Sequence, residues 1–437
     1  MRFTASGLAA DLGGQLHGAD AQVDGVANDS RTLRPGQLFA AVSDVRNGHD
    51  FVAAAVSAGA AAVLVERPVA VDVPSVVVPD VSRALIRIAG IARRRLPDRV
   101  VGITGSVGKT TTKDLLAGVL SRTFVTAASE RSFNNELGVP LTLANASEDT
   151  EATVVEMGAR GHGHIALLCS MARPTVGVVT VVASVHTEMM GGLDQIMVAK
   201  RELVEALPRD GVAVLNADDP RVASMAGHTP ASVLTFGAAG DVGAVDVTVD
   251  DDLRASFELS SPWGTVPVHV GVRGEHNVTN ALAAAAAALW LGVPLDEVSA
   301  GLAEPPASPW RMELVRTGAG VAVLNDAYNA GPASMAAALR ALAALTADRR
   351  IAVVGVMAEL GDDAPAEHQR IAALADELGV ELVAVGCDLY GPEPLADADA
   401  ALAALDGLAA GTAVLVKGSR VAGLERVAVG LSAGSGR

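Results

Sequence analysis

Cysteine is scarce in this sequence of 437 residues, which contains only Cys169 and Cys387. The two residues lie far apart and lack the spacing of metal ligands. A disulfide framework is therefore excluded, and a reducing compartment is expected.

Long apolar runs are also missing. The longest, Ala281–Leu291, is mostly alanine and is too short to span a bilayer, so it predicts a buried helix. The N-terminal segment Met1–Gly14 has no apolar stretch of signal-peptide length. We therefore expect a soluble, cytoplasmic protein without membrane insertion.

Positive charge is in deficit: 33 lysines and arginines face 50 acidic residues, a formal net charge of −17. Such a chain repels nucleic-acid phosphates unless it carries a strong basic patch. The densest basic cluster, Arg93-Arg94-Arg95, is predicted to be a solvated helix end rather than a nucleic-acid site. The negative net charge is still compatible with an anionic substrate, because one lysine or arginine in a cleft can overcome a diffuse negative field.

The length of the chain suggests three domains, with boundaries predicted at 1–98, 99–306 and 307–437. From Val100, apolar strands alternate with helices, which predicts an α/β fold whose central doubly wound sheet is mostly parallel. The segment Val245–Val272 alternates differently and predicts an antiparallel extension. After the prolines of Glu304–Pro309 the strand–helix rhythm resumes, which predicts a Rossmann-like C-terminal domain.

A glycine-rich segment, Thr104–Thr111 (TGSVGKTT), lies directly between an apolar strand and a helix. Glycines let backbone amides turn toward an anion, and the helix N-terminus adds partial positive charge. Lys109 is predicted to reach the β/γ-phosphates, and the Thr110 hydroxyl to ligate magnesium. The strict motif is not met, because Ile103 stands at its first glycine; the alternative is a turn that binds nothing. Kinases, nucleic-acid motors and ligases all use such loops.

Glu156 and His186 follow successive apolar strands, so both are expected at the sheet edge that carries the glycine-rich loop. A carboxylate there suits magnesium. Considered alone, Glu156 is predicted to be a helix-capping or surface carboxylate. Considered alone, His186 is predicted to be a loop histidine. Their shared placement favours the functional interpretation.

Other polar residues are ambiguous on spacing alone. Lys200 lies on an amphipathic helix and by itself reads as a solvated lysine. Asn277 and Asn280 begin the Ala-rich helix and could contact a purine or cap the helix. Polar residues also follow strands of the last region and could bind ligands or form ordinary turns: Arg311, Asp326, Tyr328, Asn329 and Lys417–Arg420.

Taken together, these segments resemble the Mur ligase family, and within it the branch that adds D-alanyl-D-alanine. The resemblance covers nearly the whole chain through eleven ordered matches: NDSR, GHDFV, TGSVGKTTTKD, SFNNELGVPLTL, VVEMGARGHGHI, LNADDP, GEHNVTNALAA, WRMELV, NDAYNAGPASM, MAELG and VKGSR. The segments SFNNELGVP and YNAGPASM are the most typical of that branch. The motif D-N-P-R of the branch that adds a diamino acid is not found.

The resemblance implies an ATP-dependent, ADP-forming ligase that joins D-alanyl-D-alanine to a UDP-N-acetylmuramoyl tripeptide through an acyl phosphate. It implies ATP and two magnesium ions as cofactors, no nucleic-acid partner, and we expect a monomer. ATP contacts are implied for Gly105, Ser106, Val107, Gly108, Lys109, Thr110, Thr111, Asn277, Arg311 and Asp326. Magnesium ligands are implied for Thr110, Glu156, His186 and a carbamylated Lys200. Substrate contacts are implied for Ser30, Arg31, Asn134, Asn135, Tyr328 and Asn329. Catalytic roles are implied for Lys109, Glu156, His186, Lys200 and Arg311.

Two positions depart from the family pattern. Gly331 stands where asparagine is usual, and Val356 where aspartate is common. The first departure leaves open a family member that joins another amino acid or peptide in secondary metabolism. A catalytically silent nucleotide-binding scaffold is a third hypothesis, which the set Lys109, Thr110, Glu156, His186 and Lys200 disfavours.

Overall fold

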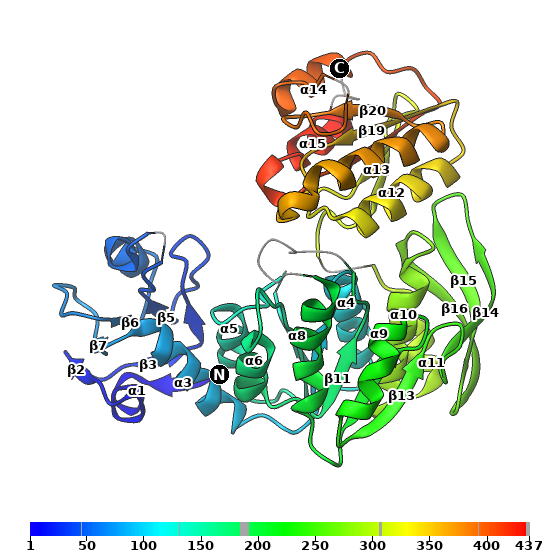
Figure 1. The fold of residues 1–437 in the computed structure, drawn as a ribbon. Coiled ribbons are helices and arrows are strands. Elements are labelled where there is room, and N and C mark those ends of the chain that lie inside the picture. The colour runs from blue at the N-terminus through cyan, green and yellow to red at the C-terminus, as the bar shows by residue number, and fades with distance from the viewer. Residues whose placement is uncertain (45, 131, 184–191, 306–307, 392, 434–437) are drawn as a thin grey trace.

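The computed structural model describes residues 1–44, 46–130, 132–183, 192–305, 308–391 and 393–433. Its strands form five sheets, which belong to three α/β units along the chain (Figure 1). In that view the N-terminal unit lies beside the central unit, and the C-terminal unit lies above the central one. The predicted α/β fold with three domains is confirmed.

The N-terminal unit contains a five-stranded sheet of order β2-β7-β6-β5-β4 and a small β1-β3 sheet. Its middle strands are short, apolar and buried, as the sequence predicts. Its elements are β1 (Arg2–Thr4), α1 (Ala5–Leu12), β2 (Gln15–His17), β3 (Gln22–Asp24), β4 (Val26–Ala27), β5 (Leu38–Ala40), η1 (Gly48–Phe51), α2 (Val52–Ser57), β6 (Ala62–Val65), β7 (Ser75–Val77) and α3 (Val81–Arg93).

The central unit is built on a six-stranded, wholly parallel sheet of order β13-β12-β11-β8-β10-β9. Strands β10 and β11 flank β8, so all three carboxyl ends meet at one sheet edge, where doubly wound folds bind ligands. Its strands and helices are β8 (Val100–Thr104), α4 (Lys109–Ser121), β9 (Thr126–Ala128), α5 (Gly138–Asn145), β10 (Ala152–Glu156), α6 (His164–Ala172), β11 (Val176–Val179), α8 (Leu193–Glu205), β12 (Val212–Asn216), α9 (Pro220–Ala223), η2 (Ser224–His228) and β13 (Ser232–Phe236).

An antiparallel sheet and two helices complete the central unit. The sheet has the order β14-β15-β16, as predicted for Val245–Val272. Helix α10 is buried along its alanine run, and its small side chains let it pack against α4 and α11. None of the described helices has the length and apolar character needed to cross a membrane. The elements are β14 (Gly243–Val249), β15 (Arg254–Ser261), β16 (Gly264–Arg273), α10 (Asn277–Trp290) and α11 (Leu295–Leu302).

The C-terminal unit has a five-stranded sheet of order β17-β18-β21-β19-β20, in which only β17 pairs antiparallel. Helices cover both faces, as expected for a Rossmann-like unit. Its elements are β17 (Glu313–Arg316), β18 (Ala322–Asn325), α12 (Pro332–Ala344), β19 (Arg349–Val354), η3 (Gly361–Asp363), α13 (Ala364–Glu377), β20 (Glu381–Ala384), α14 (Ala398–Ala404), β21 (Thr412–Lys417), η4 (Arg420–Ala422) and α15 (Glu425–Ala433).

The hydrophobic cores join the units unequally. One continuous cluster contains Leu85 and Ile88 of α3 together with Val139 and Leu143 of α5, so the N-terminal and central units share a core. The C-terminal unit has its own clusters on the two faces of its sheet, and the central unit adds Leu253 to one of them. Apolar burial is the dominant favourable term in folding, so the shared core fixes the first two units together.

The arginine cluster at the end of α3 differs from the prediction of a solvated helix end. Arg94 and Arg95 are exposed, but Arg93 is only 3% exposed. Its guanidinium donates to the carbonyl oxygens of Ala172 (2.7 Å) and Leu96 (3.0 Å). The prediction was wrong for Arg93 because the end of α6, which lies opposite it, leaves carbonyls that need donors.

Replacement of Arg93 by alanine should therefore destabilise the protein. Several buried carbonyl oxygens lose a charged donor, which is expected to lower the free energy of unfolding by about 3 kcal/mol. The measurement is urea-induced unfolding followed by circular dichroism. Arg94→Ala, one residue away and exposed, is the matched control and should stay within about 0.5 kcal/mol of the parent. Equal effects of the two substitutions would contradict this account of Arg93.

Candidate active site

The glycine-rich loop joins the end of β8 to the start of α4. Gly105 has φ 151° and Gly108 has φ 88°, both in the region that favours glycine. A Cβ atom at Gly105 would lie 1.8 Å from Thr180 Oγ1, and one at Gly108 would lie 2.3 Å from Asn280 Oδ1. Both glycines are thus required by the close approach of neighbouring side chains. The first residues of α4 line the cavity, and the first amides of a helix have no acceptor within the helix.

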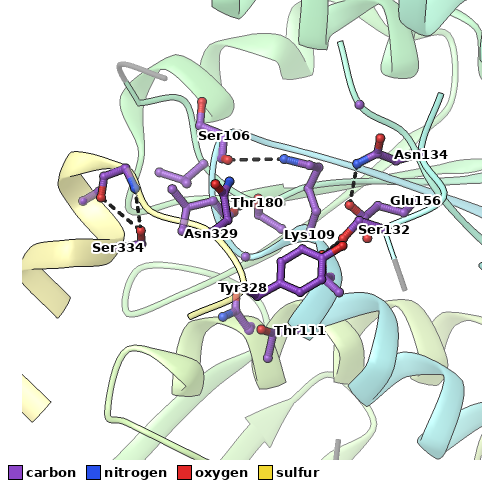
Figure 2. A pocket seen from close by; sticks show the side chains of 18 of the residues that line it. Ser106, Lys109, Thr111, Ser132, Asn134, Glu156, Thr180, Tyr328, Asn329 and Ser334 are labelled. Atoms are coloured by element: carbon purple, nitrogen blue, oxygen red, sulfur yellow. Dashed lines mark hydrogen bonds between the residues drawn. The ribbon is translucent and has the colours of Figure 1, made fainter. Parts of the chain in front are cut away.

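Lys109, the first residue of α4, folds back over the loop. Its Nζ donates to the carbonyl oxygens of Gly105 (2.8 Å) and Ser106 (3.2 Å), as Figure 2 shows for Ser106. Burial lowers the pKa of Lys109; the nearby Glu156 carboxylate raises it, and Arg311 lowers it further. An anion in the loop would offset that burial penalty on the charged amine.

Glu156 ends β10, next to β8 in the sheet, and is 1% exposed. Its Oε1 accepts a hydrogen bond from Asn134 Nδ2 at 2.9 Å (Figure 2), whereas its Oε2 is buried and has no hydrogen-bond partner among the described residues. The surface-carboxylate interpretation is excluded. A buried, unpaired carboxylate oxygen needs an external partner, and a hard divalent cation is one that fits it.

The Thr110 hydroxyl is a second oxygen available to a cation. It lies 3.1 Å from Ser132 Oγ and accepts a hydrogen bond from Arg311 Nη2 at 3.1 Å. Within the described ranges, no group of three or more histidine, cysteine, aspartate or glutamate side chains is arranged as a metal site. Glu156 and Thr110 fit a magnesium ion, but a further anionic ligand has to come from elsewhere.

Lys200 lies on α8 and points into the same region. It is 3% exposed, so the solvated-lysine interpretation from its spacing was wrong. The amphipathic pattern predicted the helix, but not that this position faces the sheet edge. Burial lowers the pKa of Lys200 well below the ordinary value, and the charge of Lys109 lowers it further. Lys200 therefore loses its proton more readily than an exposed lysine does.

The C-terminal unit brings further groups toward the loop. The Arg311 guanidinium lies 4.2 Å from the centroid of the Tyr328 ring while it donates to Thr110. Asp326 forms a buried ion pair with Lys417, whose Nζ also donates to the Asn329 carbonyl oxygen at 2.9 Å. Burial lowers the pKa of Lys417, and Asp326 opposes that shift. Lys417 thereby holds the turn that carries Tyr328 and Asn329.

These groups surround one cavity of about 620 Å³ between the central and C-terminal units. The structure brings together most of the predicted site residues in its wall: Ser106, Val107, Gly108, Lys109, Thr110, Thr111, Asn134, Asn135, Glu156, Lys200, Asn277, Arg311, Asp326, Tyr328 and Asn329. Gly105 contributes its carbonyl oxygen to Lys109.

Two further predicted residues, Ser30 and Arg31, are not in this wall. Ser30 and Arg31 belong to the N-terminal unit, where Arg31 pairs with Asp29 (2.6 Å) and its side chain is 77% exposed. His186 lies outside the described residues.

Asn277 and Asn280 form a linked pair at the start of α10. Asn277 Nδ2 donates to the Arg273 carbonyl oxygen (2.6 Å), and Asn280 Nδ2 donates to Asn277 Oδ1 (2.7 Å). Both residues also line the cavity. The capping interpretation is wrong for Asn277, because α10 has no side-chain cap among the described residues and this amide donates to a carbonyl before the helix. Asn280 packs against the Gly108 turn.

Sequence reasoning missed several residues of the wall, including Ser132, Arg160, His164 and Thr180. It left Lys417 open between a ligand contact and an ordinary turn. One signal was available. The chain has four lysines, Lys109, Lys113, Lys200 and Lys417, against 29 arginines. Lys113, Lys200 and Lys417 are buried and Lys109 is half-buried, and all except Lys113 line the cavity. Lys113 lies one turn along α4 and pairs with Asp114 at 2.6 Å.

A glycine-rich loop at the carboxyl edge of a doubly wound parallel sheet, closed by a second α/β unit, defines a nucleotide-binding α/β protein of the P-loop class. Comparison with known families identifies the family within this class. The chain matches the Mur ligase middle domain over residues 103–288 and the Mur ligase, glutamate ligase domain over residues 310–420.

Individual relatives agree with these matches. A UDP-N-acetylmuramoyl-tripeptide–D-alanyl-D-alanine ligase of Mycobacterium tuberculosis is 42% identical, over 98% of this chain and 96% of the relative. The Escherichia coli ligase of the same name is 37% identical over 97% of both chains. The crystal structure of MurF from Acinetobacter baumannii superposes with a TM-score of 0.88, at 30% identity and 99% coverage of both chains. MurF from Thermotoga maritima in complex with ADP has a TM-score of 0.81, at 28% identity over 94% of this chain and 97% of that one. This chain belongs to the Mur ligase family.

Substitution of Gly108 should impair nucleotide binding without unfolding the protein. Gly108→Ala introduces a Cβ that meets Asn280 at a left-handed φ, which displaces the loop amides; we expect at least a tenfold, or about 1.4 kcal/mol, loss in affinity for ADP. Isothermal titration calorimetry measures this. Gly227→Ala is the matched control, because a Cβ there meets nothing within 4 Å and its φ is ordinary. Unchanged ADP affinity in Gly108→Ala would contradict the assignment of the loop.

Proposed function

We propose that this protein joins D-alanyl-D-alanine to a UDP-N-acetylmuramoyl tripeptide at the expense of ATP, releasing ADP and phosphate. Relatives that are 42% and 37% identical to this chain are named for this reaction. The observation that carries the chemistry is one cavity whose wall brings Lys109, Lys200 and Arg311 together with the buried Glu156 carboxylate. Such an arrangement suits several anionic groups held together, as a transferred phosphate and its carboxylate acceptor are.

The three units have distinct proposed roles. Residues 1–98 hold the UDP end of the donor substrate, residues 99–306 bind ATP, and residues 307–437 close over ATP and the amine. Ser30 and Arg31, which follow β4 directly, are the proposed UDP contacts. Their distance from the cavity wall agrees with a donor substrate that spans two units.

In the first step, a carboxylate oxygen of the tripeptide attacks the γ-phosphorus of ATP, and the bond to the β-phosphate oxygen breaks. The products are an acyl phosphate and ADP. This transfer requires mainly positioning and charge neutralisation. The loop amides, Lys109 and Arg311 bind the phosphates, and Asn134 and Asn135 orient the donor peptide. Asn277 and Asp326 are the proposed contacts to the rest of the nucleotide.

Magnesium is the proposed metal cofactor, with Thr110, Glu156, His186 and a carbamylated Lys200 as its ligands at two sites. When bound, magnesium neutralises charge on the phosphate oxygens. The unpaired Glu156 Oε2 supports a cation here. In the proposed carbamylation, the neutral Lys200 amine attacks carbon dioxide and releases a proton. The product is an anionic oxygen ligand that suits magnesium.

In the second step, the amine of D-alanyl-D-alanine attacks the acyl carbon to give a tetrahedral intermediate. The bond from carbon to the phosphate oxygen then breaks, phosphate leaves, and the amine nitrogen loses a proton. Tyr328 and Asn329 lie on the turn held by Lys417 and are proposed to contact the amine substrate. Closure of the C-terminal unit would exclude water, which otherwise hydrolyses the acyl phosphate.

The cellular setting is also a proposal. Both cysteines are buried and unpaired, which agrees with a reducing compartment. We propose that the protein acts in the cytoplasm as a monomer and supplies the pentapeptide precursor for peptidoglycan.

The proposed reaction can be tested with purified protein, ATP, magnesium, UDP-N-acetylmuramoyl tripeptide and a panel of amine acceptors. D-alanyl-D-alanine should be preferred, and mass spectrometry should identify the pentapeptide. Lys109→Ala should lower ADP formation by at least about a hundredfold, because a positioned charge on the transferred phosphate is lost. Arg209→Ala, an exposed residue outside the cavity, should match the parent.

Two results would reject this assignment. Indifference of the parent protein to D-alanyl-D-alanine, with preference for another amine, would favour a ligase of secondary metabolism. Absence of ADP formation by the parent with every acceptor would favour a nucleotide-binding scaffold.

Carbamylation of Lys200 makes activity depend on carbon dioxide and on pH. Activity should fall in degassed buffer and return with bicarbonate, and ¹³C-bicarbonate should give a carbamate resonance in the parent spectrum. As pH falls, protonation of the amine removes the carbamate, so activity decreases; because the pKa of Lys200 is lowered, this loss occurs at lower pH than for an exposed lysine. The Lys200→Met variant should lack the resonance. A parent spectrum without it would eliminate the carbamate.

A further inference from the structure

A half-buried asparagine connects the central unit to the edge of the N-terminal sheet. Asn145 ends α5, and its Nδ2 donates to the Val26 carbonyl oxygen at 2.8 Å. Its Oδ1 accepts from the Val26 amide at 2.9 Å and from Gln37 Nε2 at 3.1 Å. One side chain thus pairs with both backbone groups of a residue 119 positions away in the sequence.

The Asn145 side chain pairs with the edge of the N-terminal sheet where a further strand would otherwise pair. Val26 lies in β4, which pairs with β5 and is the last strand of its sheet. An edge strand presents backbone N–H and C=O groups that the sheet does not pair. The Asn145 amide supplies one donor and one acceptor to Val26, so these side-chain hydrogen bonds connect the edge of the N-terminal sheet to the central unit.

Gly25 gives a second, independent indication that the contact is specific. It has φ 85°, and a Cβ atom there would lie 2.1 Å from Asn145 Oδ1 and 3.3 Å from Gln37 Nε2. The backbone before Val26 therefore approaches Asn145 more closely than any residue other than glycine permits.

Both ends of α5 border proposed substrate contacts. Asn134 and Asn135 precede the helix, and the Asn135 Oδ1 accepts from the Gly138 amide at 2.9 Å, which fixes the first turn. At the other end, Asn145 holds Val26, four residues before Ser30. An eight-residue helix is about 12 Å long. Helix α5 is therefore a rigid spacer between the two groups of contacts.

We propose that Asn145 is a positioning residue that fixes the distance between the N-terminal contacts Ser30 and Arg31 and the central contacts Asn134 and Asn135. This inference rests on the proposed function, in which one donor substrate reaches both groups. The asparagine touches no reacting atom. It acts by holding β4 in register on α5, so that a substrate of fixed length meets both units at once.

The test compares steady-state kinetics of the parent, Asn145→Ala and Asn145→Asp. Asparagine to aspartate keeps the shape and the acceptor but replaces the donor to the Val26 carbonyl with an oxygen. Both variants should raise the KM for UDP-N-acetylmuramoyl tripeptide about tenfold, since two oriented hydrogen bonds are lost or opposed. The KM values for ATP and D-alanyl-D-alanine, and kcat, should stay within about twofold of the parent.

A shortened donor separates positioning from a general structural effect. Muramoyl tripeptide without UDP cannot reach both units, so its kcat/KM should be the same in the parent and in both Asn145 variants. Glu148→Gln is the matched control: Glu148 pairs with Arg95 across the same boundary at 2.6 Å, but this pair is exposed and should have little effect.

Gly25→Ala provides a variant that leaves Asn145 itself unchanged. It should raise the KM for the full-length donor as Asn145→Ala does. The double variant Gly25→Ala/Asn145→Ala should be less impaired than the product of the two single effects, because the oxygen that the new Cβ meets has been removed. Hydrogen exchange of the Val26 amide should speed up in all of these variants.

Two outcomes would overturn the inference. One is an unchanged KM for the full-length donor in variants whose Val26 amide exchanges faster. The other is a parallel loss with the full-length and the shortened donor, which would show a general effect on the fold. A parent protein that forms no product would instead reject the proposed function, and the two failures are thereby distinguishable.

Discussion

The burial of lysine amines close to other cationic groups is the constraint on which this active site depends. Lys109, Lys200 and Arg311 lie around one cavity whose wall also carries the buried carboxylates of Glu156 and Asp326, and Asp326 is already paired with Lys417. Burial and like charge together lower the pKa values of both lysines. The rest of the fold must hold these groups in place against that repulsion. Anionic phosphate and carboxylate groups relieve it, so the cavity is complementary to the substrates of a phosphoryl transfer.

The parallel sheet supplies the necessary rigidity. Strands β8 and β10 are adjacent and buried along their whole length, so the loop before Lys109 and the carboxylate of Glu156 are fixed relative to one another. Burial in the cavity wall also separates Lys109 and Lys200 from the acidic surface. A chain of net charge −17 can therefore bind anions, because its exposed charges are screened by solvent while the cavity charges are not.

The two junctions between units differ in physical character. The first is a shared hydrophobic core completed by buried polar contacts from Arg93 and Asn145. The second consists mainly of polar contacts around the cavity, such as the hydrogen bond from Arg311 to Thr110. A shared core resists relative motion, whereas hydrogen bonds at a cavity can be exchanged for bonds to a ligand. Movement is thus expected at the second junction. The departure Gly331 lies in the cavity wall beside it, whereas Val356 packs against the C-terminal core.

The sequence by itself determined the units, the parallel central sheet, the antiparallel extension, the buried alanine helix and the glycine-rich loop. These follow from local periodicity and from glycine positions, which short stretches of chain encode. Tertiary structure alone decided which polar side chains are buried and which of them line the cavity. The helical pattern around Lys200 is the same for a surface lysine and a buried one. The run of three arginines at Arg93 predicts a solvated helix end. Only the packing of α8 on the sheet and of α3 on α6 buries these two side chains. The pairing of Asn145 with Val26 likewise joins residues 119 positions apart, a separation over which no local pattern carries information.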